Sequence, residues 1–317
     1  MRRLVSITLA AILLATPVAA MAQAYPNKAI RLIVPFAAGA GTDVIARTVM
    51  QRAGEILGQP MLIENRAGAG GNIGAEAGAK AAADGYTITI LSTIHAANQS
   101  FYRKLGYSME GDFVPVVEIG VSPTLWVVRA DLPVRTLQEL AQLARSSAGK
   151  LTYGSGGASH PVELFKALTG SDIIVVPYKG VAAVMQDLVA GRVDMSVAGF
   201  LDTDAHIRSG KLRALATTNS ERLSQLPDVP AMREFLPGYD FTLWYGIFVP
   251  RETPAAAIAA LRSSVLRALE SPEVIARLQA LAIRPAKSST EGFAARVQAE
   301  VARWADTVKK AKIELQD

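Results

Sequence analysis

Short runs of β-branched and other apolar residues alternate with segments of helical periodicity along most of the chain. The runs begin with IRLIVPF and recur as MLIEN, YTITIL, DIIVVPY, RVDMSVAGF and LRALATT. The segment 43–57 after the first run places Ile45, Val49 and Ala53 at helical spacing, and Gly58 is a suitable end for that helix. Strands that alternate with helices predict an α/β fold, in which crossover helices flank mostly parallel sheets.

Two passages suggest how the chain is divided into domains. TLWVVRADLPVRTLQEL from Thr124 and TLWYGIFVPRETPAAAIAAL from Thr242 both run from Thr-Leu-Trp through an apolar stretch and a Pro-bearing turn into a helix. If they are the strands by which the chain leaves one lobe and returns to it, residues 25–123 and 245–317 form a first lobe, and 124–244 form a second lobe inserted in it. A chance match of three residues is the alternative interpretation.

The first residues read as a secretory signal peptide. A positive start, MRR, precedes an apolar stretch and A-x-A cleavage sites that end near Ala22 or Ala24, so we assign residues 1–24 to the signal. The apolar stretch is too short for a spanning helix and is interrupted by Pro17. The chain has no cysteine, which excludes a disulfide framework. The mature protein is therefore expected to be exported and stabilised by a large core.

Charge and histidine placement argue against several function classes. The formal charge of +5 falls to +3 when the two arginines of the signal leave, and no dense Lys/Arg run remains, so we expect no nucleic-acid partner. His95, His160 and His206 lie far apart without cysteine partners, so we expect no metal site and no cofactor. Ser155 near His160 does not match the G-x-S-x-G elbow of hydrolases. We expect no catalytic residue, and a secreted hydrolase is the third-ranked hypothesis.

The stretch IVPFAAGAGTDVIAR leads from a predicted strand through a glycine-rich turn into a helix. Gly39 and Gly41 permit positive φ or close approach of the backbone to a ligand, and Thr42 or Asp43 is the expected N-cap of a helix that starts near residue 43. The free N–H groups and the positive dipole end of such a helix attract anions. Val44 occupies the place of the third glycine of a dinucleotide fingerprint, so a nucleotide is not the expected ligand.

A second loop of this design follows in the other half of the chain. KLTYGSGGASHPVELFKAL, residues 150–168, reads as a strand, a Gly/Ser loop and a helix opened by Pro161. One such loop in each lobe suits an anion with carboxyl groups held between the lobes. For GAGGNIG at 68–74 we favour a permissive turn before a helix over the alternative of a ligand contact. Ser92 and Thr93 follow a strand, where they could reach a ligand or remain in a loop without contact, as we expect for His95.

Ordered blocks over the whole mature length resemble one family. They include YPNKAIRLIVPFAAGAGTDVIAR, GQPMLIENRAGAGGNIGA, LTYGSGG, VPYKG, AGRVDM, SGKLRALATT, LPDVPAMREF and GYDFTLWYGIFVPRETP. In these blocks the chain resembles the periplasmic solute-binding receptors of tripartite tricarboxylate transporters, also called the Bug family. The resemblance implies a two-lobed periplasmic binding protein of the Venus-flytrap, type II-like kind. It also implies a small carboxylate as ligand, bound in the cleft, and the membrane permease components of a tripartite transporter as partners.

The resemblance also implies positions for the ligand contacts. The first-lobe loop falls on Phe36 to Asp43, where backbone N–H groups and Thr42 would hold a carboxylate. Its second-lobe counterpart falls on Ser155 to His160, but about one helical turn of the usual loop is missing here. The contacts expected by resemblance are Phe36, Ala37, Gly39, Gly41, Thr42, Asp43, Ser155, Gly156, Gly157 and Ser159.

AGFLDTDAH at 198–206 is a second departure from the family pattern, which more often has a proline-containing apolar stretch there. Two interpretations of Asp202 and Asp204 stay open: they face the cleft and demand a hydrogen-bond donor or cation on the ligand, or they are solvated caps of the next helix, which we favour. Lys179 in VPYKG is a candidate second-lobe contact, with an exposed lysine as the alternative.

The leading hypothesis is a periplasmic, monomeric carboxylate receptor without catalytic activity, which closes because its ligand touches both lobes at once. The runner-up is an exported sensor that hands its loaded form to a signalling partner instead of a permease.

Overall fold

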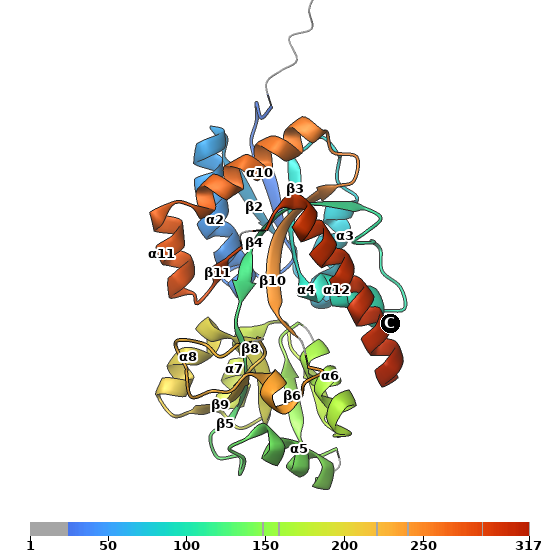
Figure 1. Ribbon diagram of the computed structural model, residues 1–317, viewed down its shortest axis with the longest axis vertical. Coiled ribbons are helices and arrows are strands. Elements are labelled where there is room, and N and C mark those ends of the chain that lie inside the picture. Colours follow the sequence, from blue (N-terminus) through green and yellow to red (C-terminus); the bar gives the residue numbers. More distant parts are fainter. Residues whose placement is uncertain are drawn as a thin grey trace, which may run out of the picture.

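The computed structural model describes residues 25–147, 149–157, 159–219, 221–239, 241–286 and 288–316. The signal-peptide assignment, residues 1–24, lies outside the described residues. Two lobes stack along the long axis of the molecule, each a β-sheet flanked by helices (Figure 1). This arrangement confirms the prediction of a two-lobed α/β fold. Within the described residues no helix combines the length and the apolar character needed to cross a bilayer.

The first lobe is built on a six-stranded sheet of order β11-β4-β10-β3-β1-β2. Its strands are β1 (Ile30–Val34), β2 (Met61–Asn65), β3 (Thr87–Ser92), β4 (Phe113–Ser122), β10 (Leu243–Pro250) and β11 (Arg284–Pro285). Its helices are α2 (Gly41–Leu57), α3 (Asn72–Ala79), α4 (Thr93–Phe101), α10 (Ala255–Leu269), α11 (Pro272–Ala280) and α12 (Thr290–Ala311), with the short 3-10 turn η1 (Ala69–Gly71) before α3.

The second lobe is built on a five-stranded sheet of order β7-β6-β8-β5-β9. Its strands are β5 (Thr124–Arg129), β6 (Thr152–Ser155), β7 (Ile174–Pro177), β8 (Met195–Gly199) and β9 (Leu212–Thr217). Its helices are α5 (Leu137–Ser146), α6 (His160–Thr169), α7 (Val181–Val189), α8 (Phe200–Arg208) and α9 (Met232–Phe235).

Both sheets are mixed, not mostly parallel as expected. β1 pairs in parallel with β2 and β3, and β6 with β7 and β8. In each sheet, however, one strand runs antiparallel to its neighbours, and it is the strand with which the chain enters that lobe. In the second lobe this strand is β5, which lies between β8 and β9. In the first lobe it is β10, which lies between β3 and β4. The sequence alternates strands and helices elsewhere, so periodicity alone did not show the reversed direction of these two strands.

The chain passes between the lobes twice, at Pro123 between β4 and β5, and just before β10. Thr124, the predicted first residue of the inserted lobe, is the first residue of β5. Leu243 and Trp244, which that analysis placed in the inserted lobe, already pair with Ser122 and Val121 of β4 in the first sheet. The return to the first lobe thus begins about two residues earlier than the expected boundary.

Helix α12 packs against both lobes. Its first half buries Phe293 and Val297 in a cluster with Trp244 and Phe248 of the first lobe. Its second half buries Trp304 in a cluster that also includes side chains of the second-lobe sheet. Figure 1 shows this helix, in red, running from the upper lobe down to the level of α6. The lobes therefore share packed apolar surface in addition to the two connecting strands.

Candidate functional site

A cavity of about 520 Å³ lies between the lobes and is lined by residues of both. Its size falls in the range typical of small-molecule sites. The first lobe contributes the loop before α2, the loop before α3 and the start of α4. The second lobe contributes the segments that follow β6, β7 and β8. All of these segments follow the carboxyl ends of strands, where open α/β sheets bind ligands. The starts of β5 and β10 and the residues Leu281 and Ile283 complete the lining.

The first wall of the cavity is the loop that leads into α2. The helix begins at Gly41 with Ala40 as N-cap, and no side chain caps it. The expected N-cap at Thr42 or Asp43 is therefore wrong, and the helix starts two residues before the expected position 43. Asp43 is the third helical residue, and its carboxylate accepts a hydrogen bond from Gly39, which precedes the helix. Gly39 has φ 79°, a left-handed conformation that glycine adopts without steric cost.

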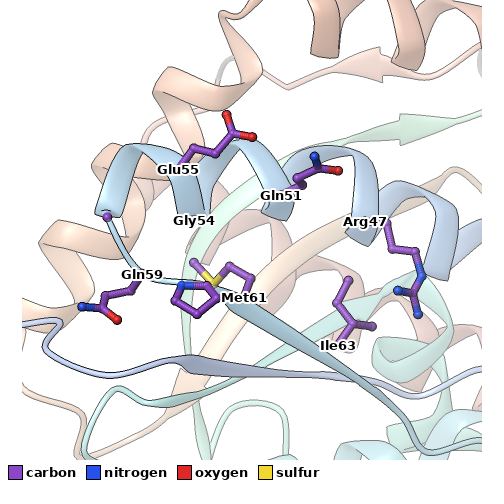
Figure 2. A pocket seen from close by; sticks show the side chains of 9 residues that line it. Arg47, Gln51, Gly54, Glu55, Gln59, Met61 and Ile63 are labelled. Atoms are coloured by element: carbon purple, nitrogen blue, oxygen red, sulfur yellow. The ribbon is translucent and has the colours of Figure 1, made fainter.

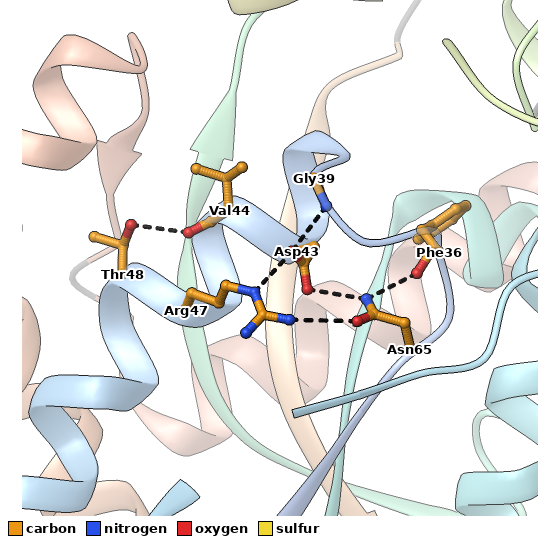
Figure 3. A network of polar contacts seen from close by, with 7 residues as sticks. All are labelled: Phe36, Gly39, Asp43, Val44, Arg47, Thr48 and Asn65. Atoms are coloured by element: carbon orange, nitrogen blue, oxygen red, sulfur yellow. Dashed lines mark hydrogen bonds and ion pairs between the residues drawn. The ribbon is translucent and has the colours of Figure 1, made fainter. Parts of the chain in front are cut away.

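Asp43 fixes the conformation of this loop from the side that faces away from the cavity. Its Oδ2 accepts hydrogen bonds from the Gly39 N–H and from Arg47 Nε, each at 2.9 Å. Its Oδ1 accepts from Asn65 Nδ2 at 2.9 Å, and the same amide nitrogen donates to the Phe36 carbonyl at 3.0 Å. Figure 3 shows the resulting network, which ties the loop to the end of β2. The Asp43 carboxylate is thus engaged with protein groups and does not line the cavity.

The electrostatics of Asp43 agree with this role. Burial by itself raises the pKa of a carboxyl group, but the hydrogen bonds from Arg47, Gly39 and Asn65 outweigh it and hold the pKa of Asp43 below its usual value. Asp43 is 2% exposed and ionised at neutral pH. A negative charge in the first turn also stabilises the helix through its dipole.

Thr42 faces the cavity from the same turn. It is hydrogen-bonded to Tyr245 of β10, and that bond lowers the pKa of Tyr245, although burial raises it by more. Phe36, Ala37, Ala40 and Gly41 complete this part of the wall. Because no side chain caps α2, the N–H groups of its first turn are available to an anion.

The second wall carries two further helix N-termini. α7 starts after Gly180 and α8 after Gly199, and neither has a side-chain cap on its N-cap residue. Gly156 lies beside the start of α7, where a Cβ on Gly156 would meet the Val181 backbone nitrogen at 2.8 Å. Glycine at 156 therefore lets the loop after β6 pack directly on the start of α7.

Lys179 and Asp202 both line this wall, and Lys179 is at the same time exposed, as in the alternative interpretation. Asp202 is the third residue of α8, half-buried, and its carboxylate accepts a hydrogen bond from the Gly199 N–H. Burial raises the pKa of Asp202 and outweighs that hydrogen bond. The carboxylate of Asp204 instead accepts a hydrogen bond from Arg208 Nε at 2.9 Å on the exposed surface of α8. The two aspartates therefore differ: the cleft-facing interpretation fits Asp202, and the surface interpretation fits Asp204.

Ser92 and Thr93 do not line the cavity. Ser92 is the N-cap of α4, and its Oγ lies 3.2 Å from His95 Nδ1. Thr93 Oγ1 donates to the Thr242 carbonyl at 2.7 Å and accepts from the Trp244 N–H at 3.0 Å, so it ties α4 to the returning chain. His95 was expected in a loop; it lies inside α4, because the helix starts directly after β3, and burial lowers its pKa to about 3.

Ser155 and Ser159 are also buried away from the cavity. Ser155 ends β6, and its carbonyl accepts the Tyr178 N–H at 2.8 Å. Ser159 Oγ accepts from Gln316 Nε2 at 3.0 Å, which connects the second lobe to the C-terminal segment. The His160 ring packs edge-on against Phe101, with centroids 4.3 Å apart, and its Nδ1 has no partner in the part of the chain described here. Burial lowers the pKa of His160 to about 3.

Of the thirteen residues that the sequence offered as candidate contacts, seven line the cavity. They are Phe36, Ala37, Gly41, Thr42, Gly156, Gly157 and Asp202. The other six support the walls: Gly39 and Asp43 within the network of Figure 3, and Ser92, Thr93, Ser155 and Ser159 through the contacts given above.

One segment that the sequence analysis set aside as a turn also lines the cavity. Residues 67–71, including Gly70 and Gly71, face the second lobe, and a Cβ on Gly70 would meet the Gly157 carbonyl oxygen at 2.9 Å. The segment does precede a helix, as expected. Its place at the carboxyl end of β2, next to β1 in the sheet, is the signal that could have found it.

A second hollow, of about 550 Å³, lies outside the cleft. Figure 2 shows it between α2 and β2, lined by residues that include Gln51, Glu55 and Met61. Arg47 at its edge is already paired with Asp43. Among the residues that the structure describes, no group of three or more His, Asp or Glu side chains is placed to hold a metal ion.

The sequence matches a known family over most of its length. The family described as the tripartite tricarboxylate transporter family receptor matches residues 45–313. A Pseudomonas sp. (strain P51) protein, described as the UPF0065 protein in the tcbD-tcbE intergenic region, is 36% identical over 89% of this chain and 86% of its own. The protein BugT of Bordetella pertussis is 34% identical over 95% of this chain and 94% of its own.

Solved structures show the same architecture. A Rhodopseudomonas palustris protein, Rpa4515, solved with adipate, has a TM-score of 0.84 at 35% identity and covers 92% of this chain and 100% of its own. MatC from the same species, solved with bound malate, has a TM-score of 0.83 at 35% identity and covers 90% and 100%. The members of this family and these structural neighbours are solute-binding receptors, not enzymes. The chain belongs to the tripartite tricarboxylate transporter receptor family.

Proposed function

We propose that this protein is a periplasmic receptor that captures a small carboxylate between its lobes and delivers it to the membrane components of a tripartite transporter. The observation that carries the proposal is the meeting of uncapped helix N-termini from both lobes, α2 from one and α7 from the other, at a single cavity. Such ends supply N–H donors and positive dipole charge to an anion. Related proteins solved with adipate and malate support a carboxylate as the ligand.

The cavity walls explain how closure would depend on the ligand. Apart from Lys179 and Asp202, the lining residues that the structure describes are uncharged, and apolar side chains such as Ile45, Val181 and Phe200 come from both lobes. A ligand held by both walls binds the closed arrangement better than an open one, so it shifts the population toward closure. The closed, loaded form is then the state that a transporter can distinguish from the empty one.

Titration calorimetry against a panel of mono-, di- and tricarboxylates tests the binding part of the proposal. The blocking variant is Gly41→Leu, because a Cβ at Gly41 meets no heavy atom within 4 Å and the added side chain would fill space at the cavity wall. The control is Ala259→Leu on the exposed side of α10. We expect binding by the wild type and the control and none by Gly41→Leu. Absence of heat with every carboxylate would contradict the proposal.

Uptake of the labelled ligand tests delivery. Cells that lack the protein should regain uptake with the wild type and with Ala259→Leu, but not with Gly41→Leu. Normal uptake in cells without the protein would refute the transport role and leave the binding role intact.

A further inference from the structure

The cavity contains one positive and one negative side chain. Among its described lining residues, Lys179 and Asp202 are the charged ones, and both belong to the second lobe. The described side chains of the cavity therefore carry no net charge. A dicarboxylate would bring two negative charges into this space, whereas an acid that also carries an ammonium group would bring a balanced pair.

Asp202 occupies the start of its own helix. As the third residue of α8 it accepts the Gly199 N–H, and a Cβ on Gly199 would lie 3.0 Å from Asp202 Oδ2. The free N–H groups and dipole of a helix start would otherwise attract a ligand anion. Here the carboxylate of Asp202 lies at that end of α8 and lines the cavity, so a second ligand carboxylate would meet a negative charge there.

Asp202 forms no ion pair with any described residue, in contrast to Asp204, which pairs with Arg208 on the surface. A half-buried carboxylate without a counter-ion is costly, and burial accordingly raises its pKa. A hydroxyl or ammonium group of a ligand would supply the missing donor.

Asp202 also lies opposite the first wall. Its charge raises the pKa of Tyr245, the β10 residue whose side chain is hydrogen-bonded to Thr42 at the start of α2. A ligand carboxylate placed between Thr42 and Asp202 would meet a like charge at short range in a partly desolvated site, which disfavours it strongly. Lys179, beside the start of α7, is the favourable place for the ligand's carboxylate.

We propose that Asp202 selects ligands that carry one carboxylate and, at the other end, an ammonium or hydroxyl group, and that it excludes dicarboxylates. The carboxylate binds at the Lys179 end of the cavity, and the donor group binds to Asp202. This inference rests on the proposed function, since it specifies which small acids the receptor accepts.

Matched acids of four, five and six carbons test this selectivity. At each chain length four compounds are compared: the simple acid, the terminal hydroxy acid, the terminal amino acid and the dicarboxylate. For six carbons these are hexanoate, 6-hydroxyhexanoate, 6-aminohexanoate and adipate. Dissociation constants are measured by calorimetry for the wild type and Asp202→Asn. The control is Asp204→Asn, which changes the same charge on the outer side of the same helix.

At the best-fitting length we expect the wild type to bind the amino acid at least ten-fold more tightly than the dicarboxylate. Asp202→Asn should reduce this ratio at least ten-fold, by weakening the amino acid and strengthening the dicarboxylate, whereas Asp204→Asn should leave it unchanged. Asp202→Ser serves as a second variant if the melting temperature shows that Asn disturbs folding.

Two outcomes would overturn the inference. One is a wild type that binds the dicarboxylate as tightly as the amino acid, and the other is an unchanged ratio in both Asp202 variants. Either result leaves carboxylate binding, and with it the proposed function, in place. Failure of the whole carboxylate panel would instead remove the proposed function and this inference together.

Discussion

On the first-lobe wall, the loop before α2 is tied by Asp43 to Arg47 and Asn65, and the charge of Asp43 is turned away from the cavity. On the second-lobe wall, Lys179 and Asp202 both line the cavity. The difference indicates a division of work between the walls. The first wall holds backbone N–H donors in a fixed arrangement, and the charged side chains of the second wall contact the other polar groups of the ligand.

The largest expected effect comes from removing the group that fixes the first wall. Asp43→Ala deletes three hydrogen bonds and leaves the Gly39 N–H and the Asn65 amide without their carboxylate partner. We expect a loss of about 2–3 kcal/mol in the free energy of unfolding, together with weaker ligand binding. Chemical denaturation and calorimetry measure the two effects.

Asp204→Ala is the control on the second lobe, because Asp204 pairs with an Arg208 side chain that is 66% exposed. It should change stability by less than about 0.5 kcal/mol. Equal losses in the two variants would show that the first wall is not held more rigidly than the second.

Acidification should remove the advantage that Asp43 confers. Folding lowers the pKa of Asp43, so the unfolded chain binds this proton more tightly than the folded one. The stabilisation is present above the ordinary carboxyl value of about 3.9 and is lost as the pH falls through the lower folded-state value. The difference in unfolding free energy between wild type and Asp43→Asn should therefore shrink in acid, and a difference that grows would contradict the network.

The second wall depends on a close backbone contact, which Gly156→Ala would disturb. The new Cβ would lie 2.8 Å from the Val181 nitrogen and 2.9 Å from its Cα, so α7 has to shift. We expect a loss of about 1–3 kcal/mol, measured by denaturation, and weaker binding. Gly180→Ala is the matched control on the same wall, since its φ of 170° suits any residue and no heavy atom lies within 4 Å. A neutral Gly156→Ala would show that this wall tolerates movement.

The smallest effect is expected at Thr42. Thr42→Val removes the hydroxyl that is hydrogen-bonded to Tyr245, at a cost of about 1 kcal/mol in stability and a decrease in affinity. The control is Thr48→Val, whose hydroxyl donates to the Val44 carbonyl at 2.8 Å one turn earlier on α2 (Figure 3). If both variants bind the ligand as the wild type does, Thr42 is not part of the ligand site.

Much of the fold was accessible from the sequence, because strand runs and helical spacing are local properties. The direction of β5 and β10 was not, since pairing across a sheet depends on the route of the chain between lobes. The loop before α2 was predicted as part of the site because its glycine pattern is also a local property of the sequence. The glycines at 39 and 41 marked the right loop, but the sequence did not show that Asp43 would turn back to Gly39 and that Thr42 alone of that pair would line the cavity.

The contribution of residues 67–71 shows a second limit. GAGGNIG is a permissive turn before α3, and its spacing carries no ligand signature. Only the sheet order, with β2 beside β1, places it along the cavity. For Asp202 the sequence left two interpretations open, because a carboxylate in the first turn of a helix serves equally as a cap and as a cleft residue.

The packing of α12 on both lobes limits how far they can swing apart. Trp304 lies against Phe101 of the first lobe, with ring centroids 5.6 Å apart, and against His160 of the second at 5.8 Å. A wide rotation would separate these rings and wet the indole, which is fully shielded from solvent. We therefore expect α12 to restrict the angle to which the two lobes can open, and a shortened α12 to permit a wider opening.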